Sequence, residues 1–229
     1  MHTLPQVRQV RIRSRWEMKV SVNGIGVEVG EGTTILAAAR AAGFLIPTLC
    51  HLKGLSEVGA CRLCVVEVKG HDRLVAACNT VVQDGMEIET RSERVRETRL
   101  RNLRLILSRH DANCLVCARN GSCELQKLAR EAGLLEVDPR PPRPRVEPWD
   151  PSLSIVRNAA RCVHCLRCVK VCERELGRSV WELLGAGPTA RIGVRDGLSL
   201  KEAGCTFCGK CVENCPVAAL LPHPAEGGL

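Results

Sequence analysis

The chain has 229 residues, of which 45% are hydrophobic and 25% charged, and its formal net charge is +8 at pH 7. With two Phe, three Trp and no Tyr it lacks aromatic platforms on which nucleic-acid bases stack, so its basic charge does not predict a nucleic-acid partner. No stretch approaches the roughly 18 apolar residues of a membrane span. Residues 1–17 are basic but lack the apolar segment of a secretory signal, and we expect no direct membrane insertion.

The cysteine count indicates where the protein works. Fifteen cysteines, an odd number in a chain of this length, suit a reducing cytoplasm in which thiols stay free to bind metal. Modules this small, with so few aromatic residues, must also take much of their cohesion from bound metal. We therefore predict a cytoplasmic metalloprotein.

After the basic N-terminal extension (1–17), the first predicted module covers residues 18–95. It opens with alternating residues around Asn23-Gly24, which is typical of a hairpin. Thr33 and Thr34 offer N-caps for a helix that Gly43 ends. Residues 64–68 and 73–78 then predict two strands, joined by a turn at residues 70–72.

The second predicted module covers residues 96–137. An arginine-rich amphipathic helix is predicted between Arg91 and His110, with its polar side facing solvent or a partner. A second helix over residues 124–132 has one apolar face, made of Leu125, Leu128, Ala129 and Ala132. Residues 138–155 are rich in proline and predict an extended connector, with Trp149 as an anchor, before the last module at 156–229.

The fifteen cysteines and one histidine fall into four groups with the spacing of iron-sulfur sites. These are Cys50, Cys61, Cys64 and Cys78; His110, Cys114, Cys117 and Cys123; Cys162, Cys165, Cys168 and Cys172; and Cys205, Cys208, Cys211 and Cys215. Thiolate is a soft ligand, and four thiolates hold either a [2Fe-2S] or a [4Fe-4S] unit. The C-x2-C pair of the first group, Cys61 and Cys64, is shared with plant-type ferredoxins and favours [2Fe-2S] there.

The second group has only three thiols, so a fourth protein ligand must come from another residue. A lone histidine after an arginine-rich helix would ordinarily be interpreted as a charge that complements the helix dipole. Because a ligand is missing, coordination by His110 is the favoured interpretation here. A neutral imidazole in place of a thiolate removes negative charge, which should raise the reduction potential of the site.

Zinc bound by the same thiolates is an alternative for these groups. With the basic charge and the C-x2-C pairs, it would describe a zinc-bearing nucleic-acid-binding protein. In the first group, the spacings from Cys50 to Cys61 and from Cys64 to Cys78 are unusual for zinc ribbons. The cysteines of the two final runs are also too tightly spaced to wrap one tetrahedral ion easily.

The two final runs resemble bacterial two-cluster ferredoxins, in which the fourth cysteine of each run ligates the other run's cluster. This resemblance implies two crossed ligand sets, which are Cys162, Cys165, Cys168 and Cys215 for one cluster, and Cys205, Cys208, Cys211 and Cys172 for the other. Proline follows Cys215, as in those ferredoxins. Glu173 follows Cys172 instead, so the packing around Cys172 is less firmly predicted.

A wider resemblance rests on three segments, PTLCHLKGLSEVGACRLCVVEV, HDANCLVCARNGSCELQKLA and CTFCGKCVENCPVAAL. They resemble the electron-transfer region of the complex I large iron-sulfur subunit, of multi-cluster [FeFe]-hydrogenases and of the gamma-type diaphorase subunit of NAD(P)-linked hydrogenases. The implied fold is α+β, with a β-grasp [2Fe-2S] ferredoxin domain, a small helical [4Fe-4S] domain with one histidine and three cysteine ligands, and a bacterial-type 2[4Fe-4S] ferredoxin domain. The implied cofactors are one [2Fe-2S] cluster and three [4Fe-4S] clusters.

The resemblance also implies a function, which is to relay electrons within a cytoplasmic NAD(P)-linked hydrogenase. The implied partners are a flavin/NAD(P)-binding diaphorase subunit, a thioredoxin-like [2Fe-2S] subunit and the hydrogenase catalytic subunits, with ferredoxin added if the assembly is electron-bifurcating. Every cysteine is assigned and no G-x-G-x-x-G is present, so we expect no catalytic or nucleotide site in this chain. Formate dehydrogenases and NADH:ferredoxin transhydrogenases reuse similar subunits and remain alternatives.

Overall fold

The structure is a computed structural model that describes residues 17–134 and 155–222. The predicted basic extension and proline-rich connector lie outside these ranges, except for Glu17 and Ile155. The described part mixes helices and strands, which confirms the α+β class in its coarse form. None of its helices is both long and apolar enough to cross a lipid bilayer.

The first strands form the predicted hairpin. Strand β1 (Glu17–Val22) pairs antiparallel with β2 (Ile25–Gly30), and Val22 lies opposite Ile25. Asn23 and Gly24 between them both have positive φ, 47° and 81°, as the mirror-image turns of tight hairpins require. The turn therefore fixes the register that points Val20 and Val22 into the core.

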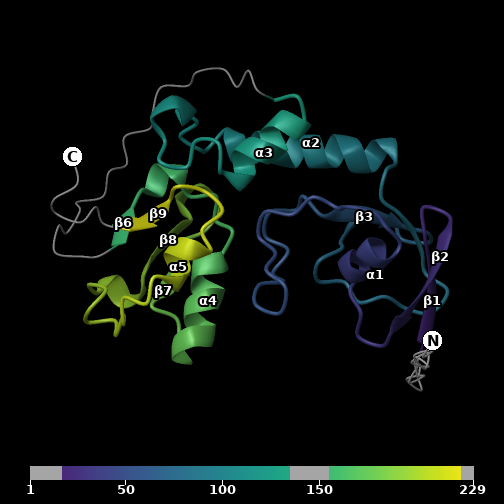
Figure 1. Cartoon of the computed structure of the whole chain (residues 1–229), viewed down its shortest axis with the longest axis horizontal. Coiled ribbons are helices and arrows are strands. Elements are labelled where there is room, and N and C mark those ends of the chain that lie inside the picture. The colour runs from purple at the N-terminus through teal and green to yellow at the C-terminus, as the bar shows by residue number, and fades with distance from the viewer. Residues whose placement is uncertain (1–16, 135–154, 223–229) are drawn as a thin grey trace, which may run out of the picture.

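The hairpin belongs to a five-stranded sheet in the order β2-β1-β5-β3-β4. Strands β3 (Val65–Val68) and β4 (Val75–Ala76) are the predicted second hairpin, whereas β5 (Glu87–Glu89), parallel to β1, was not predicted. Helix α1 (Ile35–Ala41) lies beside this sheet (Figure 1) and shares its core. It begins where the Thr34 hydroxyl accepts a hydrogen bond from the backbone N–H of Ala37, as its N-cap role predicts.

The longest described helix, α2 (Glu93–Leu107), leads from the sheet toward the C-terminal part of the molecule (Figure 1). It buries Val95, Leu103 and Leu107, so the predicted amphipathic helix is confirmed. A short 3-10 turn, η1 (Cys114–Val116), then precedes helix α3 (Glu124–Glu131), which buries Leu125 and Ala129. Ala132, predicted for the same apolar face, is the C-cap of this helix and is exposed.

The last part consists of two short helices and two strand pairs. Helices α4 (Arg167–Leu176) and α5 (Lys210–Glu213) pack together, and β6 (Ile155–Arg157) pairs with β9 (Leu220–Pro222). Strands β7 (Trp181–Leu184) and β8 (Arg191–Val194) form the other pair. Three 3-10 turns complete this part, η2 (Ala159–Arg161), η3 (Gly187–Thr189) and η4 (Arg195–Gly197).

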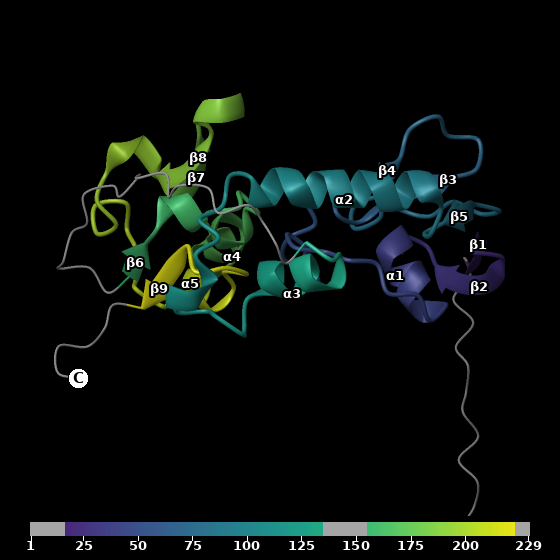
Figure 2. The same cartoon turned by 90° about the horizontal axis from the view of Figure 1, so that it is seen from above.

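The buried side chains form two cores that do not follow the predicted module boundaries. One lies between the sheet and α1. The other starts at the ligand loop of the first part and continues through α2 and α3 into the C-terminal part, and its members include Leu49, Cys50, Cys61, Leu103, Leu125, Cys165, Trp181 and Val217. Figure 2 shows α2 and α3 between the two ends of the molecule. Cys50, Cys61 and most cysteines of the last two runs therefore share one core, whereas Cys64 and Cys78 belong to the core of the sheet.

Candidate iron-sulfur centres

The first cysteine group comes together at one end of the five-stranded sheet. Cys50 follows α1, Cys61 and Cys64 lie just before β3, and Cys78 follows β4. All four side chains are buried. Cys50 lies close enough to Cys61 and Cys78, and Cys64 to Cys78, for these thiols to shift one another's pKa. The four predicted residues thus occupy one site.

This site favours negative charge on one sulfur and disfavours it on two others, since the hydrogen bonds shared with Cys50 raise the pKa values of Cys61 and Cys78. Hydrogen bonds from the thiols of Cys61 and Cys78 hold the pKa of Cys50 far below its usual range, and the backbone N–H groups of Cys61 and Ala60 add to the effect. The backbone N–H of Cys61 lies 3.5 Å from the Cys50 sulfur. Gly59, in the same loop, has φ of 66°, a left-handed conformation that favours glycine. Such donors are what a buried thiolate ligand requires.

Helix α2 holds the first ligand loop from outside. The Arg99 guanidinium donates two hydrogen bonds to the carbonyl oxygen of Val65, at 3.2 and 2.8 Å, and the Asn102 amide donates to the carbonyl of Arg62 at 2.8 Å. Burial lowers the pKa of Arg99, and the nearby Cys64 sulfur opposes that shift. A cation is therefore fixed beside this cysteine group.

The second group lies between α2 and α3. Cys114, Cys117 and Cys123 are half-buried. Burial raises the pKa of Cys114, and the nearby charges of Cys117 and Cys123 raise it further. The Nδ1 of His110 lies 3.0 Å from the carbonyl oxygen of Arg161. With the ring proton on Nδ1, this bond leaves the Nε2 lone pair available to a metal. Burial also lowers the pKa of His110, which favours the neutral imidazole that binds metals.

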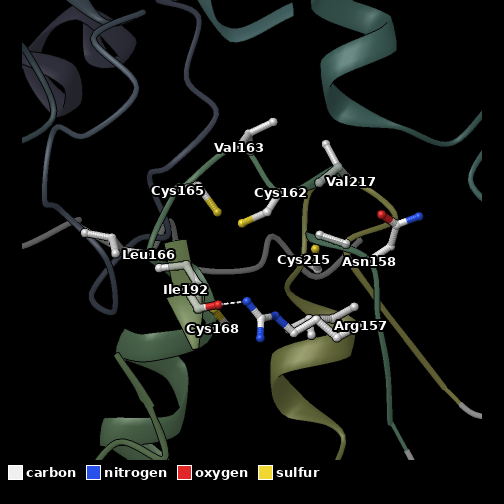
Figure 3. Close-up of a pocket in the computed structure, with 12 residues that line it drawn as sticks. Arg157, Asn158, Cys162, Val163, Cys165, Leu166, Cys168, Ile192, Cys215 and Val217 are labelled. Atoms are coloured by element: carbon white, nitrogen blue, oxygen red, sulfur yellow. Dashed lines mark hydrogen bonds between the residues drawn. The ribbon is translucent and has the colours of Figure 1, made fainter. Parts of the chain in front are cut away.

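In the third site, residues from the last two cysteine runs meet. Cys162, Cys165 and Cys168 line one cavity together with Cys215, which comes from the other run, and Figure 3 shows these side chains around it. The rest of the wall is mainly apolar, including Val163, Ile192 and Val217. Burial raises the pKa of Cys165 to about 12 and also raises the pKa values of Cys162 and Cys168. Bare thiolates are disfavoured in this cavity, and a bound cationic centre would compensate them.

In the fourth site, Cys172 lies close enough to Cys205 and Cys211 for its charge to raise their pKa values. The backbone N–H of Val180 lies 3.4 Å from the sulfur of Cys172, and that of Phe207 lies 3.4 Å from the sulfur of Cys205. Burial raises the pKa of Cys211 to about 11, although a hydrogen bond from the buried Trp181 side chain opposes the shift. Cys208, the remaining member, is exposed.

The two cysteine runs have the same backbone shape. In the first run, the residues before and after the second cysteine, His164 and Leu166, have φ of 51° and 63°. In the second run, Phe207 and Gly209 stand at the equivalent places, with φ of 55° and 74°. Left-handed residues alternating with ordinary ones turn successive N–H groups toward one point, which forms a cradle for an anionic group. Leu166 keeps this conformation despite the strain it carries outside glycine.

Glu173 follows the fourth cysteine of the first run, where two-cluster ferredoxins have proline, and this difference has a local structural consequence. Helix α4 continues past Cys172 to Leu176, and the Glu173 carboxylate pairs with Lys170 on the helix surface at 2.7 Å. Helix α5 instead ends at Glu213, just before Cys215 and its proline. Glutamate therefore fits at this position because the chain stays helical there, and the cysteine run keeps its shape.

All fifteen cysteines lie within the described residues and are free thiols. In residues 17–134 and 155–222, no three His, Cys, Asp or Glu side chains are placed to hold a single metal ion. The donor set still suits iron-sulfur clusters, because soft sulfur atoms lie near one another within each proposed ligand set and backbone N–H groups point at several of them.

Three family models match consecutive regions of the chain. Residues 16–93 match a 2Fe-2S iron-sulfur cluster binding domain, residues 99–138 match the NADH-ubiquinone oxidoreductase-G iron-sulfur binding region, and residues 154–216 match a 4Fe-4S dicluster domain. The chain is therefore a multi-domain iron-sulfur protein.

Its relatives are components of NAD(P)-linked oxidoreductases. The chain is 39% identical over 210 residues to the G 2 component of the NADH-quinone oxidoreductase of Rhizobium meliloti (strain 1021), covering 90% of this chain and 24% of that protein. It is 38% identical over 211 residues to the HndD component of the NADP-reducing hydrogenase of Solidesulfovibrio fructosivorans, covering 90% of this chain and 36% of that protein. It thus spans about a quarter to a third of the length of these relatives.

A solved structure extends the likeness to three dimensions. A chain of an NAD+-reducing [NiFe]-hydrogenase, crystallised in its H2-reduced state, superposes with a TM-score of 0.72 at 29% identity, covering 91% of this chain and 88% of that one. The chain is thus related to components of NADH-quinone oxidoreductases and of NAD(P)-linked hydrogenases, which confirms the resemblance drawn from its motifs.

Proposed function

We propose that the chain is the iron-sulfur electron-transfer subunit of a cytoplasmic NAD(P)-linked hydrogenase. It relays single electrons between a flavin/NAD(P)-binding diaphorase subunit and the hydrogenase catalytic subunits. A thioredoxin-like [2Fe-2S] subunit is a further partner, and ferredoxin is another if the assembly is electron-bifurcating. The observation that carries this proposal is the cavity where Cys215 joins Cys162, Cys165 and Cys168, as a two-cluster ferredoxin requires. The hydrogenase likeness over 88% of a solved chain supports the choice of complex.

In this proposal the sixteen predicted ligands hold four clusters. A [2Fe-2S] cluster is assigned to the β-grasp part, on Cys50, Cys61, Cys64 and Cys78. One [4Fe-4S] cluster is assigned to the helical part, on His110, Cys114, Cys117 and Cys123. Two more are assigned to the crossed sets, one on Cys162, Cys165, Cys168 and Cys215 and the other on Cys205, Cys208, Cys211 and Cys172. Each bound cluster would supply one-electron redox chemistry.

The protein's own contribution is to bind, space and shield these centres. The cysteine thiolates and the His110 imidazole bind metal, and the N–H groups of Cys61, Val180 and Phe207 donate to sulfur. Such bonds stabilise negative charge on the ligands and so tune the potential. The apolar wall of the third site limits water there, whereas the exposed Cys208 brings the fourth site to the surface. Free thiols throughout the described residues support a reducing, cytoplasmic location.

Anaerobic purification from the native host tests this function. The expected result is a brown complex whose bound proteins include a flavin-binding subunit and a hydrogen-activating subunit. Electron paramagnetic resonance during stepwise reduction should reveal one [2Fe-2S] and three [4Fe-4S] signals. A formate dehydrogenase or a transhydrogenase catalytic subunit in the complex would redirect the assignment. A preparation with zinc but without iron and acid-labile sulfide would overturn it.

A further inference from the structure

Arg167, the first residue of α4, is a buried cation that the ligand sets do not use. Its side chain is 5% exposed, and its guanidinium donates to both carboxylate oxygens of Glu124, at 2.6 and 2.8 Å. The same group donates to the carbonyl oxygen of His51 at 3.3 Å and to that of Asn214 at 3.5 Å. One side chain therefore joins three segments that are far apart in the sequence.

Each segment that Arg167 contacts carries a proposed cluster ligand next to the contact. His51 follows Cys50, Glu124 follows Cys123, and Asn214 precedes Cys215. Arg167 itself precedes Cys168. The guanidinium thus connects the ligand segments of three proposed clusters, one from each iron-sulfur region of the chain.

The chemistry of arginine suits this connection. Its planar guanidinium offers five N–H donors in a fixed fork, so it can bind a carboxylate through two bonds and still reach backbone carbonyls. A lysine ammonium in the same place is a point charge on a flexible stem and would not set the angles between the segments.

Stability alone does not explain a cation held in this place. The Arg167 side chain is 5% exposed and that of Glu124 is 46% exposed, so the guanidinium loses its hydration while its carboxylate partner stays partly in water. An ion pair with a solvated partner offsets little of that desolvation cost. The Nε of Arg167 also has no hydrogen-bond partner among the described residues, and a buried N–H without a partner is costly. What the arrangement fixes is geometry, since all its acceptors lie on segments that carry ligands.

We propose that Arg167 is a positioning residue that sets the spacing between the cluster of Cys50 and the cluster of Cys168 and Cys215. This inference rests on the proposed electron-transfer function. The step it serves moves one electron, so that one centre is oxidised and the other reduced, with no bond made or broken. Electron tunnelling weakens exponentially as the distance between two centres grows, so a side chain that fixes this spacing controls the rate.

The test uses the full chain, isolated anaerobically with its clusters, in three variants. Arg167→Lys keeps the charge but loses the fork, and Arg167→Met loses both. Lys170→Met, on the same helix, removes a surface pair with Glu173 and serves as the matched control. Iron and acid-labile sulfide are measured first. Freeze-quench electron paramagnetic resonance then follows how fast one added electron redistributes between the two centres, and pulsed measurements report their magnetic coupling.

Both Arg167 variants should retain the iron and sulfide of the control, redistribute the electron several-fold more slowly and show altered magnetic coupling, because only the spacing changes. Redistribution and coupling like those of the control would overturn the proposal. Loss of iron from both variants, with normal redistribution among the clusters that remain, would also overturn it, because Arg167 would then serve cluster retention. Absence of iron and sulfide from the unsubstituted chain would instead count against the proposed function itself.

Discussion

Cys215 lines the same cavity as Cys162, although the two residues belong to different cysteine runs. The β6–β9 pair makes this possible, because it places Arg157 opposite Leu220 and so joins the two ends of the C-terminal part. Cys162 follows β6 by a few residues and Cys215 precedes β9 by a few residues. The strand pair therefore brings the two sulfur atoms to one site.

This relationship predicts a pattern of iron loss. In Cys162→Ala and in Cys215→Ala, we expect the chain to lose about four iron atoms, because each variant removes a ligand from one [4Fe-4S] cluster. The double variant with both substitutions should lose no more than either single variant. Combining Cys215→Ala with Cys205→Ala should instead remove about eight iron atoms, since the two residues then serve different clusters.

Iron and sulfide quantitation on anaerobically reconstituted protein reads out this pattern, with Mössbauer spectra to count the remaining clusters. If each run instead ligates its own cluster, the results of the two double variants are reversed. The Cys162–Cys215 double variant would then lose twice as much iron as either single variant.

The second prediction concerns His110, the proposed fourth ligand of the second cluster. We expect His110→Cys to lower the midpoint potential of the second cluster, because a thiolate adds one negative charge where a neutral imidazole stood. A redox titration followed by electron paramagnetic resonance measures the shift. His71→Ala, at an exposed turn, is the control and should leave every midpoint unchanged. An unchanged or higher midpoint in His110→Cys would speak against histidine coordination.

Local sequence signals account for the features that could be predicted. Asn23-Gly24 specifies its turn, Thr34 caps α1, and the cysteine spacing defines each run, because all of these depend on neighbours along the chain. Arg167 gave no such signal. It is one of 33 lysines and arginines, and its partners come from three distant segments. Strand β5 was missed for the same reason, since its pairing with β1 joins distant parts of the chain.

Helix α3 shows a second kind of limit. The apolar periodicity predicts a helix over residues 124–132 with Ala132 on its apolar face, whereas the structure has Ala132 as the exposed C-cap of α3. Element ends depend on capping contacts as well as on periodicity. The hydrogen bond from the Glu124 N–H to the Pro216 carbonyl, at 3.1 Å, likewise ties the start of this helix to a distant segment.

The third prediction concerns the left-handed residue Gly209. We expect Gly209→Ala to destabilise the cluster-loaded chain by about 1 kcal/mol, because alanine is strained in the left-handed region. At this chain length that change lowers the midpoint temperature by about 2–4 °C. The measurement is the temperature at which the brown absorbance bleaches under anaerobic heating.

Gly26→Ala is the matched control for this variant. Gly26 lies in β2 without a positive φ, and an added methyl group meets no atom within 4 Å. Its midpoint should stay close to that of the unsubstituted chain. Equal midpoints for the two variants would argue against conformational strain at residue 209.

The last prediction concerns removal of the clusters. The core between the sheet and α1 is mostly Val, Ile, Leu and Ala, whereas the core of the C-terminal part contains many cysteines, among them Cys165, Cys168, Cys172, Cys211 and Cys215. Much of the cohesion there must come from bound metal, because apolar area is limited. Chelation of iron should therefore leave residues 155–222 largely unfolded, while part of the five-stranded sheet keeps its protection.

Hydrogen exchange on the apo chain measures this difference segment by segment. We expect fast exchange in α4 and α5 and slower exchange in β1 and β3, where Val22 and Val66 are fully buried. Reconstitution with iron and sulfide should restore protection in α4 and α5, which separates metal loss from irreversible damage. Undiminished protection of α4 in the apo chain would mean that side-chain packing, and not the metal, holds the C-terminal part together.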